Sequence, residues 1–136
     1  MDENEVIDKL CKHLKSKGWH VDSYVAAGVR GIDVVAKNPL GQIFHIEAKG
    51  GTSSDPKSAR YGSPFTKSQV FDVTSKGLMQ CFHHIAKNDP KTRTAFVYPS
   101  GKYFAQYIDP ILPLLQSAGL CLFRVNANNT IDEYFL

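Results

Sequence analysis

The sequence has few cysteines and no long hydrophobic run. Its three cysteines, Cys11, Cys81 and Cys121, are odd in number, lie far apart and form no C-x-x-C motif. This pattern disfavours a disulfide framework or a zinc site and fits a reducing cytoplasm. No signal peptide is visible at the acidic start, and no apolar run approaches the ~20 residues of a membrane span. We expect one cytoplasmic domain over residues 1–136, without repeats and without membrane attachment.

The charge balance is mildly basic. A net charge of +3 permits nucleic-acid binding without being diagnostic of it. Basic residues gather between positions 49 and 76, where they outnumber acids: Lys49, Lys57, Arg60, Lys67 and Lys76 against Asp55 and Asp72. A solvated surface explains such a cluster equally well until the neighbouring residues are considered.

Hydrophobic periodicity predicts the order of helices and strands. We expect helices over residues 4–17, 66–86 and 103–117, the last with a fresh start at Asp109-Pro110. We expect strands over residues 19–26, 31–37, 42–49, 92–98, 120–125 and 130–135. This order predicts an α/β fold in which helices flank a mixed central β-sheet.

The segment from residue 31 to residue 49 predicts two strands joined by a tight turn at Asn38-Pro39-Leu40-Gly41. Alternation along a strand places Glu47 and Lys49 on one face and Ala48 on the other. A hairpin sets Asp33, at the start of its strand, beside the end of the next strand. Two acids and a lysine are thus expected at one edge of an apolar sheet.

This combination of side chains suits phosphodiester hydrolysis. Mg²⁺ binds hard oxygen ligands and retains several waters, so Asp33 and Glu47 suffice, with the backbone carbonyl of Ala48 as a third oxygen. The ion activates a water and neutralises charge on a phosphate. Lys49 is expected to orient that water or to stabilise the phosphate.

Gly31-x-Asp33, a strand–turn–strand and Glu47-x-Lys49 together resemble the PD-(D/E)xK nuclease superfamily, also called restriction-endonuclease-like. Glycine before the acid is common in its resolvase-like branch. The resemblance implies a core of helix, three-stranded meander, helix and strand over about residues 4–98, followed here by a C-terminal helix and strands. It implies Mg²⁺-dependent hydrolysis, with Mn²⁺ able to substitute. Asp33 and Glu47 would be metal ligands and Lys49 the catalytic lysine.

Two further roles follow from the resemblance. On pattern alone, Glu5 favours the dipole of the first helix. Many members of the superfamily carry an additional acid on that helix, which maps to Glu5 as a metal ligand. Some carry a catalytic glutamine on the helix after the lysine strand, which maps to Gln69. The sequence departs from that subgroup at Val73, where a tyrosine is expected.

Residues 50–66 predict a long loop of the kind that often carries function. On the nuclease hypothesis, Lys57, Arg60 and Lys67 contact phosphates, and Tyr61 stacks on a base or packs within the protein.

The helix after the loop carries apolar residues on more than one face, which fits a homodimer. The adjacent His83 and His84 point about 100° apart and are interpreted as structural.

We expect a Mg²⁺-dependent endonuclease acting on DNA. Two alternatives stay open: a toxin-like RNase of the same fold, and a non-catalytic nucleic-acid-binding subunit.

Overall fold

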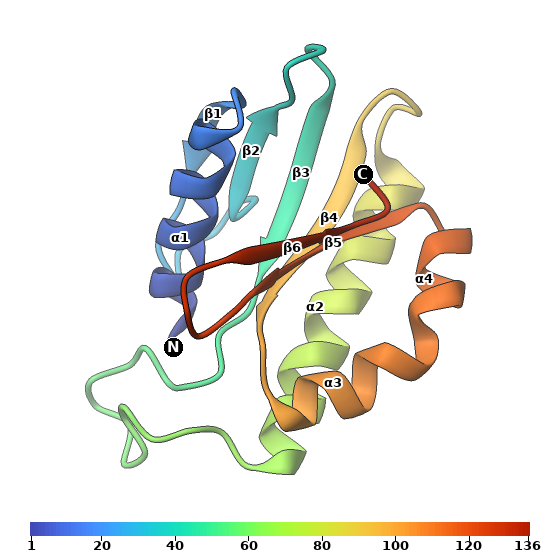
Figure 1. Cartoon of the computed structure of the whole chain (residues 1–136). Coiled ribbons are helices and arrows are strands. Elements are labelled where there is room, and N and C mark those ends of the chain that lie inside the picture. The colour runs from blue at the N-terminus through green and yellow to red at the C-terminus, as the bar shows by residue number, and fades with distance from the viewer.

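The computed structural model describes all 136 residues and confirms the predicted order of elements (Figure 1). The elements are α1 (Glu3–Ser16), β1 (His20–Tyr24), β2 (Val34–Lys37), β3 (Ile43–Ala48), α2 (Lys67–Lys87), β4 (Arg93–Pro99), α3 (Lys102–Ile108), η1 (Asp109–Ile111), α4 (Leu112–Ser117), β5 (Leu120–Val125) and β6 (Ile131–Tyr134). The 3₁₀ helix η1 begins at Asp109, as the Asp-Pro pair predicts.

One six-stranded sheet joins the strands in the order β1-β2-β3-β4-β5-β6. The meander β1-β2-β3 is antiparallel, β3-β4-β5 is parallel, and β6 returns antiparallel to β5. The predicted α/β fold with a mixed central sheet is therefore confirmed. The order α1-β1-β2-β3-α2-β4 is the one expected of a restriction-endonuclease-like core.

The pleat of the strands separates two hydrophobic cores. Ala95 and Val97 of β4 pack with α1, whereas Phe96 and Tyr98 pack with α2, α3 and α4. Helix α1 thus covers one face of the sheet and the other helices cover the opposite face (Figure 1). On β3, Phe44, Ile46 and Ala48 belong to the α1 core, which confirms that Glu47 faces the side of α2.

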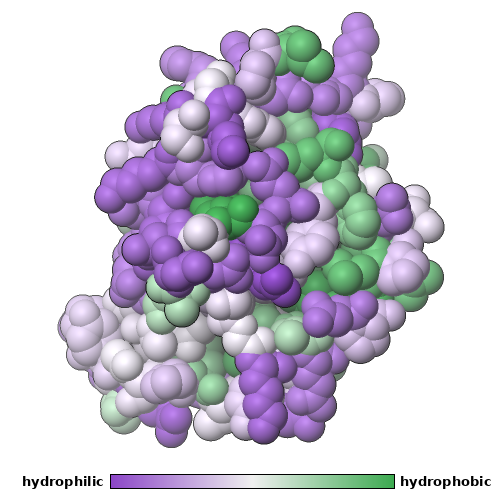
Figure 2. All heavy atoms as spheres, viewed as in Figure 1, coloured by the Kyte–Doolittle hydropathy of each residue, from purple (hydrophilic) through white to green (hydrophobic).

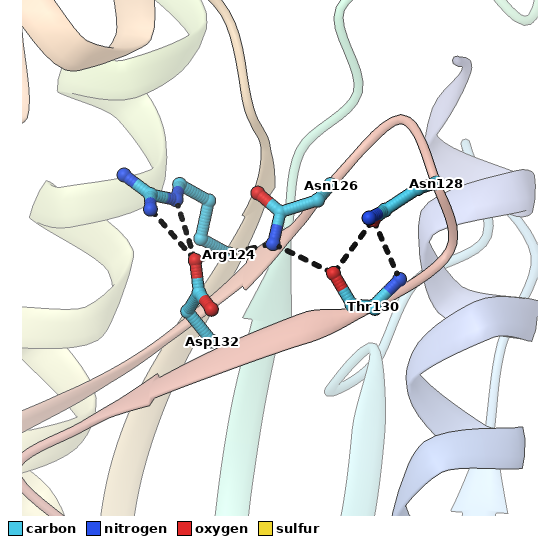
Figure 3. Close-up of polar contacts among 5 residues, drawn as sticks. All are labelled: Arg124, Asn126, Asn128, Thr130 and Asp132. Carbon is cyan, nitrogen blue, oxygen red and sulfur yellow. Dashed lines mark hydrogen bonds and ion pairs between the residues drawn. The ribbon is translucent and has the colours of Figure 1, made fainter.

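The β5–β6 hairpin closes the far edge of the sheet and is held by polar contacts (Figure 3). Arg124 and Asp132 are cross-strand partners and form an ion pair of 2.6 Å. Asn126 donates to both Thr130 and Asp132, and Thr130 also donates to Asn128 across the turn. These hydrogen bonds fix the register of β6, the last strand of the sheet.

Helix α2 also exposes apolar side chains. Phe71 and Met79 are each more than half exposed, so the helix is apolar on more than one face, as predicted. Figure 2 shows other hydrophobic residues along the right side of the molecule, the side of α4, where Leu114 is exposed. The homodimer remains a prediction.

No helix combines the length and the hydropathy that a membrane-spanning segment requires.

Gly77 lets α2 lie directly on the sheet. A Cβ atom at this position would lie 2.5 Å from Cε1 of Phe96 and 3.1 Å from Cγ of Lys49. Phe96 is fully buried and has no room to move aside. The absence of a side chain at Gly77 therefore sets the distance between α2 and β3, which carries Glu47.

Gly77→Ala is expected to lower the free energy of unfolding. Alanine gains about 1 kcal/mol over glycine in helix propensity, but overpacking against a fixed aromatic ring costs about 1–3 kcal/mol. We expect the overpacking to outweigh the propensity, which urea unfolding would measure. Ser75→Ala, at an exposed position of the same helix, is the control and should be neutral or stabilising. A Gly77→Ala protein as stable as the Ser75→Ala protein would contradict this account of the packing.

Candidate functional site

Asp33 and Glu47 lie side by side at the junction of β2 and β3. Val34 pairs with Ile46 in the antiparallel register, which sets Asp33 opposite Glu47. Oδ2 of Asp33 accepts a hydrogen bond of 2.7 Å from the backbone N–H of Ala48. Asp33 is 9% exposed and Glu47 is 5% exposed, so the hairpin buries two acids next to each other, as the sequence predicts.

The electrostatics of this pair favour a cation. Burial raises the pKa of Glu47, and the charge of Asp33 and a hydrogen bond with it raise this pKa further, to about 8, against the opposing effect of Lys49. Neither carboxylate forms an ion pair with a lysine or an arginine. Buried like charges are costly until a cation or a proton compensates them.

An open pocket of about 560 Å³ lies over these two acids. Besides Asp33 and Glu47, its lining includes Glu3, Lys49 and Gln80. The stem of Lys49 runs beside Gly77 of α2, and its amino group forms no salt bridge with any carboxylate. The pocket therefore combines hard oxygen ligands with a free ammonium group.

The acid that α1 contributes to this pocket is Glu3. Burial, with the nearby charge of Asp33, raises the pKa of Glu3 to about 7. Glu5, the residue predicted from the sequence, is exposed and does not line the pocket; its backbone N–H donates to Asp2, the N-cap of the helix. Because Glu3 and Glu5 are about 200° apart around the helix, only one of them faces the sheet.

Gly50 brings the start of α1 to the site. A Cβ atom at Gly50 would lie 2.3 Å from the backbone nitrogen of Glu3 and 2.5 Å from the carbonyl carbon of Asp2. Any side chain at this position would push α1 away. Gly50, directly after Lys49, therefore allows Glu3 to line the same pocket as Asp33 and Glu47.

Gln69 does not lie at the site. Its side-chain oxygen accepts a hydrogen bond of 2.8 Å from the backbone N–H of Thr66, and its own N–H donates to the Thr66 hydroxyl. Gln69 thus completes the capping box that begins α2. The glutamine that α2 brings to the pocket is Gln80, three turns further along.

His84 contacts Glu47 of β3, a partner that the sequence pattern does not reveal. Its Nε2 lies 2.6 Å from Oε1 of Glu47. Burial lowers the pKa of His84, whereas the pKa of Glu47 is raised to about 8. Near pH 7 in the metal-free protein, a neutral imidazole and a protonated carboxyl therefore share this hydrogen bond.

The predicted nucleic-acid-binding residues lie outside the pocket. Lys57, Arg60 and Tyr61 are exposed on the loop between β3 and α2, and Lys67 is exposed at the start of α2. None of them lines the pocket over the two acids. Their contact with nucleic acid stays a prediction.

The ligand set fits magnesium better than a softer metal. No three His, Cys, Asp or Glu side chains are arranged to hold an ion by themselves. Mg²⁺ does not need such a cage, because it retains waters and binds one or two carboxylates. Ala48 follows Glu47 directly, is buried, and donates its backbone N–H to Asp33, and its carbonyl remains the predicted third oxygen.

The fold and the paired acids define an α/β protein of the restriction-endonuclease-like fold. No protein-family model matches the chain, and no curated protein is significantly similar to it.

Two solved structures share this fold along nearly their whole length. An XisH family protein from Nostoc punctiforme aligns with a TM-score of 0.59 and 14% identity, over 95% of this chain and 97% of that chain. An fdxN element excision controlling factor protein from Anabaena variabilis aligns with a TM-score of 0.59 and 17% identity, over 98% of each chain. At these identities the similarity establishes the fold alone.

As the pH rises from about 5 to about 8, the free energy of unfolding of the metal-free protein is expected to decrease. Glu3 and Glu47 have pKa values near 7 and 8 in the folded state against 4.5 as the reference value. In this range the folded state holds protons that the unfolded state has released, so raising the pH favours unfolding. Urea unfolding in EDTA at several pH values would measure the slope.

The matched variants are Glu47→Gln and Glu5→Gln. Glu47→Gln should flatten the pH dependence, whereas Glu5→Gln, at an exposed carboxyl, should leave it unchanged. A slope that is the same in wild type and Glu47→Gln would contradict the assignment.

Proposed function

We propose that this chain is a Mg²⁺-dependent nuclease of the PD-(D/E)xK type that hydrolyses phosphodiester bonds, acting as an endonuclease on DNA. The observation that supports this function is the meeting of Asp33, Glu47 and Lys49 in one open pocket. Paired acids beside a free lysine are suited to binding a cation and a phosphate at the same place.

In this proposal Asp33 and Glu47 hold the metal, with the carbonyl of Ala48 as a further oxygen, and Glu3 lines the same pocket. When bound, Mg²⁺ (or Mn²⁺) supplies a nucleophilic water at neutral pH and neutralises charge on the phosphate. The hydrogen bond from Ala48 holds one oxygen of Asp33, and His84 holds one oxygen of Glu47. Each acid therefore keeps its other oxygen for the ion.

Lys49 is proposed as the catalytic lysine. Alternation along β3 puts it on the same face as Glu47, and its stem is supported where α2 approaches at Gly77. Free of any carboxylate partner, its ammonium group is able to hold the attacking water or a phosphate oxygen. The added positive charge stabilises the negative charge that grows on the phosphate during hydrolysis.

DNA is proposed ahead of RNA. One of the proteins that share this fold is named an fdxN element excision controlling factor. We take this name as support for DNA as the first substrate to test.

We expect wild-type protein to nick or cut plasmid DNA with Mg²⁺ and to lose this activity in EDTA. Asp33→Asn, Glu47→Gln and Lys49→Met should each reduce the rate by about 10²-fold or more, because each removes a group that stabilises the reacting phosphate. Glu5→Gln is the control and should cleave like wild type. Gel electrophoresis of timed digests, with tRNA in a parallel series, gives the rates.

Equal nicking by wild type and Asp33→Asn would refute the site. Degradation of tRNA without cleavage of plasmid would show that the substrate is RNA and not DNA. Salt-sensitive DNA binding without cleavage in Mg²⁺ or Mn²⁺ would favour a non-catalytic subunit.

His84→Leu is expected to weaken Mn²⁺ binding by about 10- to 100-fold, the usual effect of removing a residue that orients a metal ligand. His84→Gln retains a hydrogen-bond donor and should preserve most of the affinity. Isothermal titration calorimetry measures both, with His83→Gln as a control at the adjacent, exposed histidine. Wild-type affinity in His84→Leu would show that the contact with Glu47 does not orient the ligand.

A further inference from the structure

Two open depressions meet at Glu47 and form one groove beside α2. The first, of about 560 Å³, is the pocket over the acids, and the exposed Arg30 lines it. The second, of about 420 Å³, is lined by His83, His84 and Lys87 of α2. Because Gly31, Glu47 and Gln80 line both, the two depressions are continuous.

The charges along this groove alternate in sign. Arg30 lies on the connection between β1 and β2, the acids lie at the centre, and Lys87 lies near the end of α2. Neither Arg30 nor Lys87 lies within 4.0 Å of a carboxylate. Both cations are therefore free to bind an anionic ligand on either side of the acidic centre.

The dimensions of the groove wall suit a polynucleotide. Gln80, His83 and Lys87 are exposed and follow one face of α2 at positions i, i+3 and i+7. Seven residues of helix span about 10 Å, which equals about three base-pair steps of 3.4 Å along the axis of duplex DNA. A phosphate at the acidic centre would have neighbouring phosphates near the cations of the rim.

The loop of residues 50–66 offers a weaker surface for phosphates. One guanidinium nitrogen of Arg60 donates to the carbonyl of Pro64 within the loop. The backbone N–H of Lys57 donates to Asp55, an acid of the same turn. Figure 2 shows pale residues of intermediate hydropathy over the loop at the lower left, where serines, glycines and prolines dominate.

We propose that one strand of DNA lies in the groove along α2, with Arg30 and Lys87 holding phosphates on opposite sides of the phosphate that is cleaved. This inference rests on the proposed nuclease function and specifies its substrate-binding surface. It moves the main phosphate contacts from the loop, where the sequence predicts them, to the wall of the groove. Gln80 and His83 line the path between Lys87 and the acids.

The test compares two double variants that remove the same charge. Arg30→Gln with Lys87→Gln neutralises the groove, and Lys57→Gln with Arg60→Gln neutralises the loop. All four residues are exposed, so both proteins should keep the wild-type thermal unfolding temperature. Binding of a fluorescent DNA oligonucleotide is followed by anisotropy with Ca²⁺ in place of Mg²⁺, over a range of NaCl concentrations.

We expect the groove variant to lose affinity by about 10-fold or more and to reduce the slope of log K against log[salt] by about 1.5, the value for two lost phosphate contacts. The loop variant should stay within about twofold of wild type. Equal losses in both variants, or a larger loss in the loop variant, would overturn the proposal. Preference for an RNA oligonucleotide of the same sequence would overturn the choice of DNA.

This measurement separates the binding surface from the chemistry, because no cleavage is needed. Loss of binding in the groove variant alone would support the surface even if the wild type failed to cut plasmid. Wild-type protein that cuts plasmid while the groove variant binds normally would overturn the surface and leave the nuclease function standing.

Discussion

The site depends on the repulsion between two carboxylates that the β2–β3 hairpin buries side by side. Two like charges 4 Å apart repel by about 4 kcal/mol at an effective dielectric constant of 20, a sizeable share of the 5–15 kcal/mol that stabilises a typical domain. The fold reduces this cost through hydrogen bonds, from Ala48 to Asp33 and from His84 to Glu47, but supplies no ion pair to remove it. In the proposed function, a divalent cation bound by both acids relieves this repulsion.

The rest of the structure holds this pair in place. Gly77 lets α2 approach β3 closely enough for His84 and Gln80 to reach the strand acids. Gly50 does the same for α1 on the other side, which brings Glu3 to the pocket. Two positions without a side chain therefore decide which helix residues join the strand residues. Substitution of either would change the site without touching a proposed ligand.

The strand part of the site follows from the sequence because it depends on local rules. Alternation along β3 and the antiparallel register of a short hairpin are enough to bring Asp33, Glu47 and Lys49 together. The helix part does not follow in the same way. The family pattern points to Glu5 and Gln69, whereas the rotation of each helix on the sheet selects Glu3 and Gln80. That rotation depends on packing over long distances, at Gly50 and Gly77, which periodicity alone does not reveal. The capping box at Thr66 is the structural reason that Gln69 is not free for catalysis.

The most direct test is a crystal of the wild-type protein soaked in Mn²⁺ and measured at the manganese absorption edge. We expect an anomalous peak between Asp33 and Glu47, within bonding distance of a carboxylate oxygen of each. A well-diffracting crystal with no peak there, or with manganese bound only elsewhere on the surface, would contradict the claim that these two acids hold a metal.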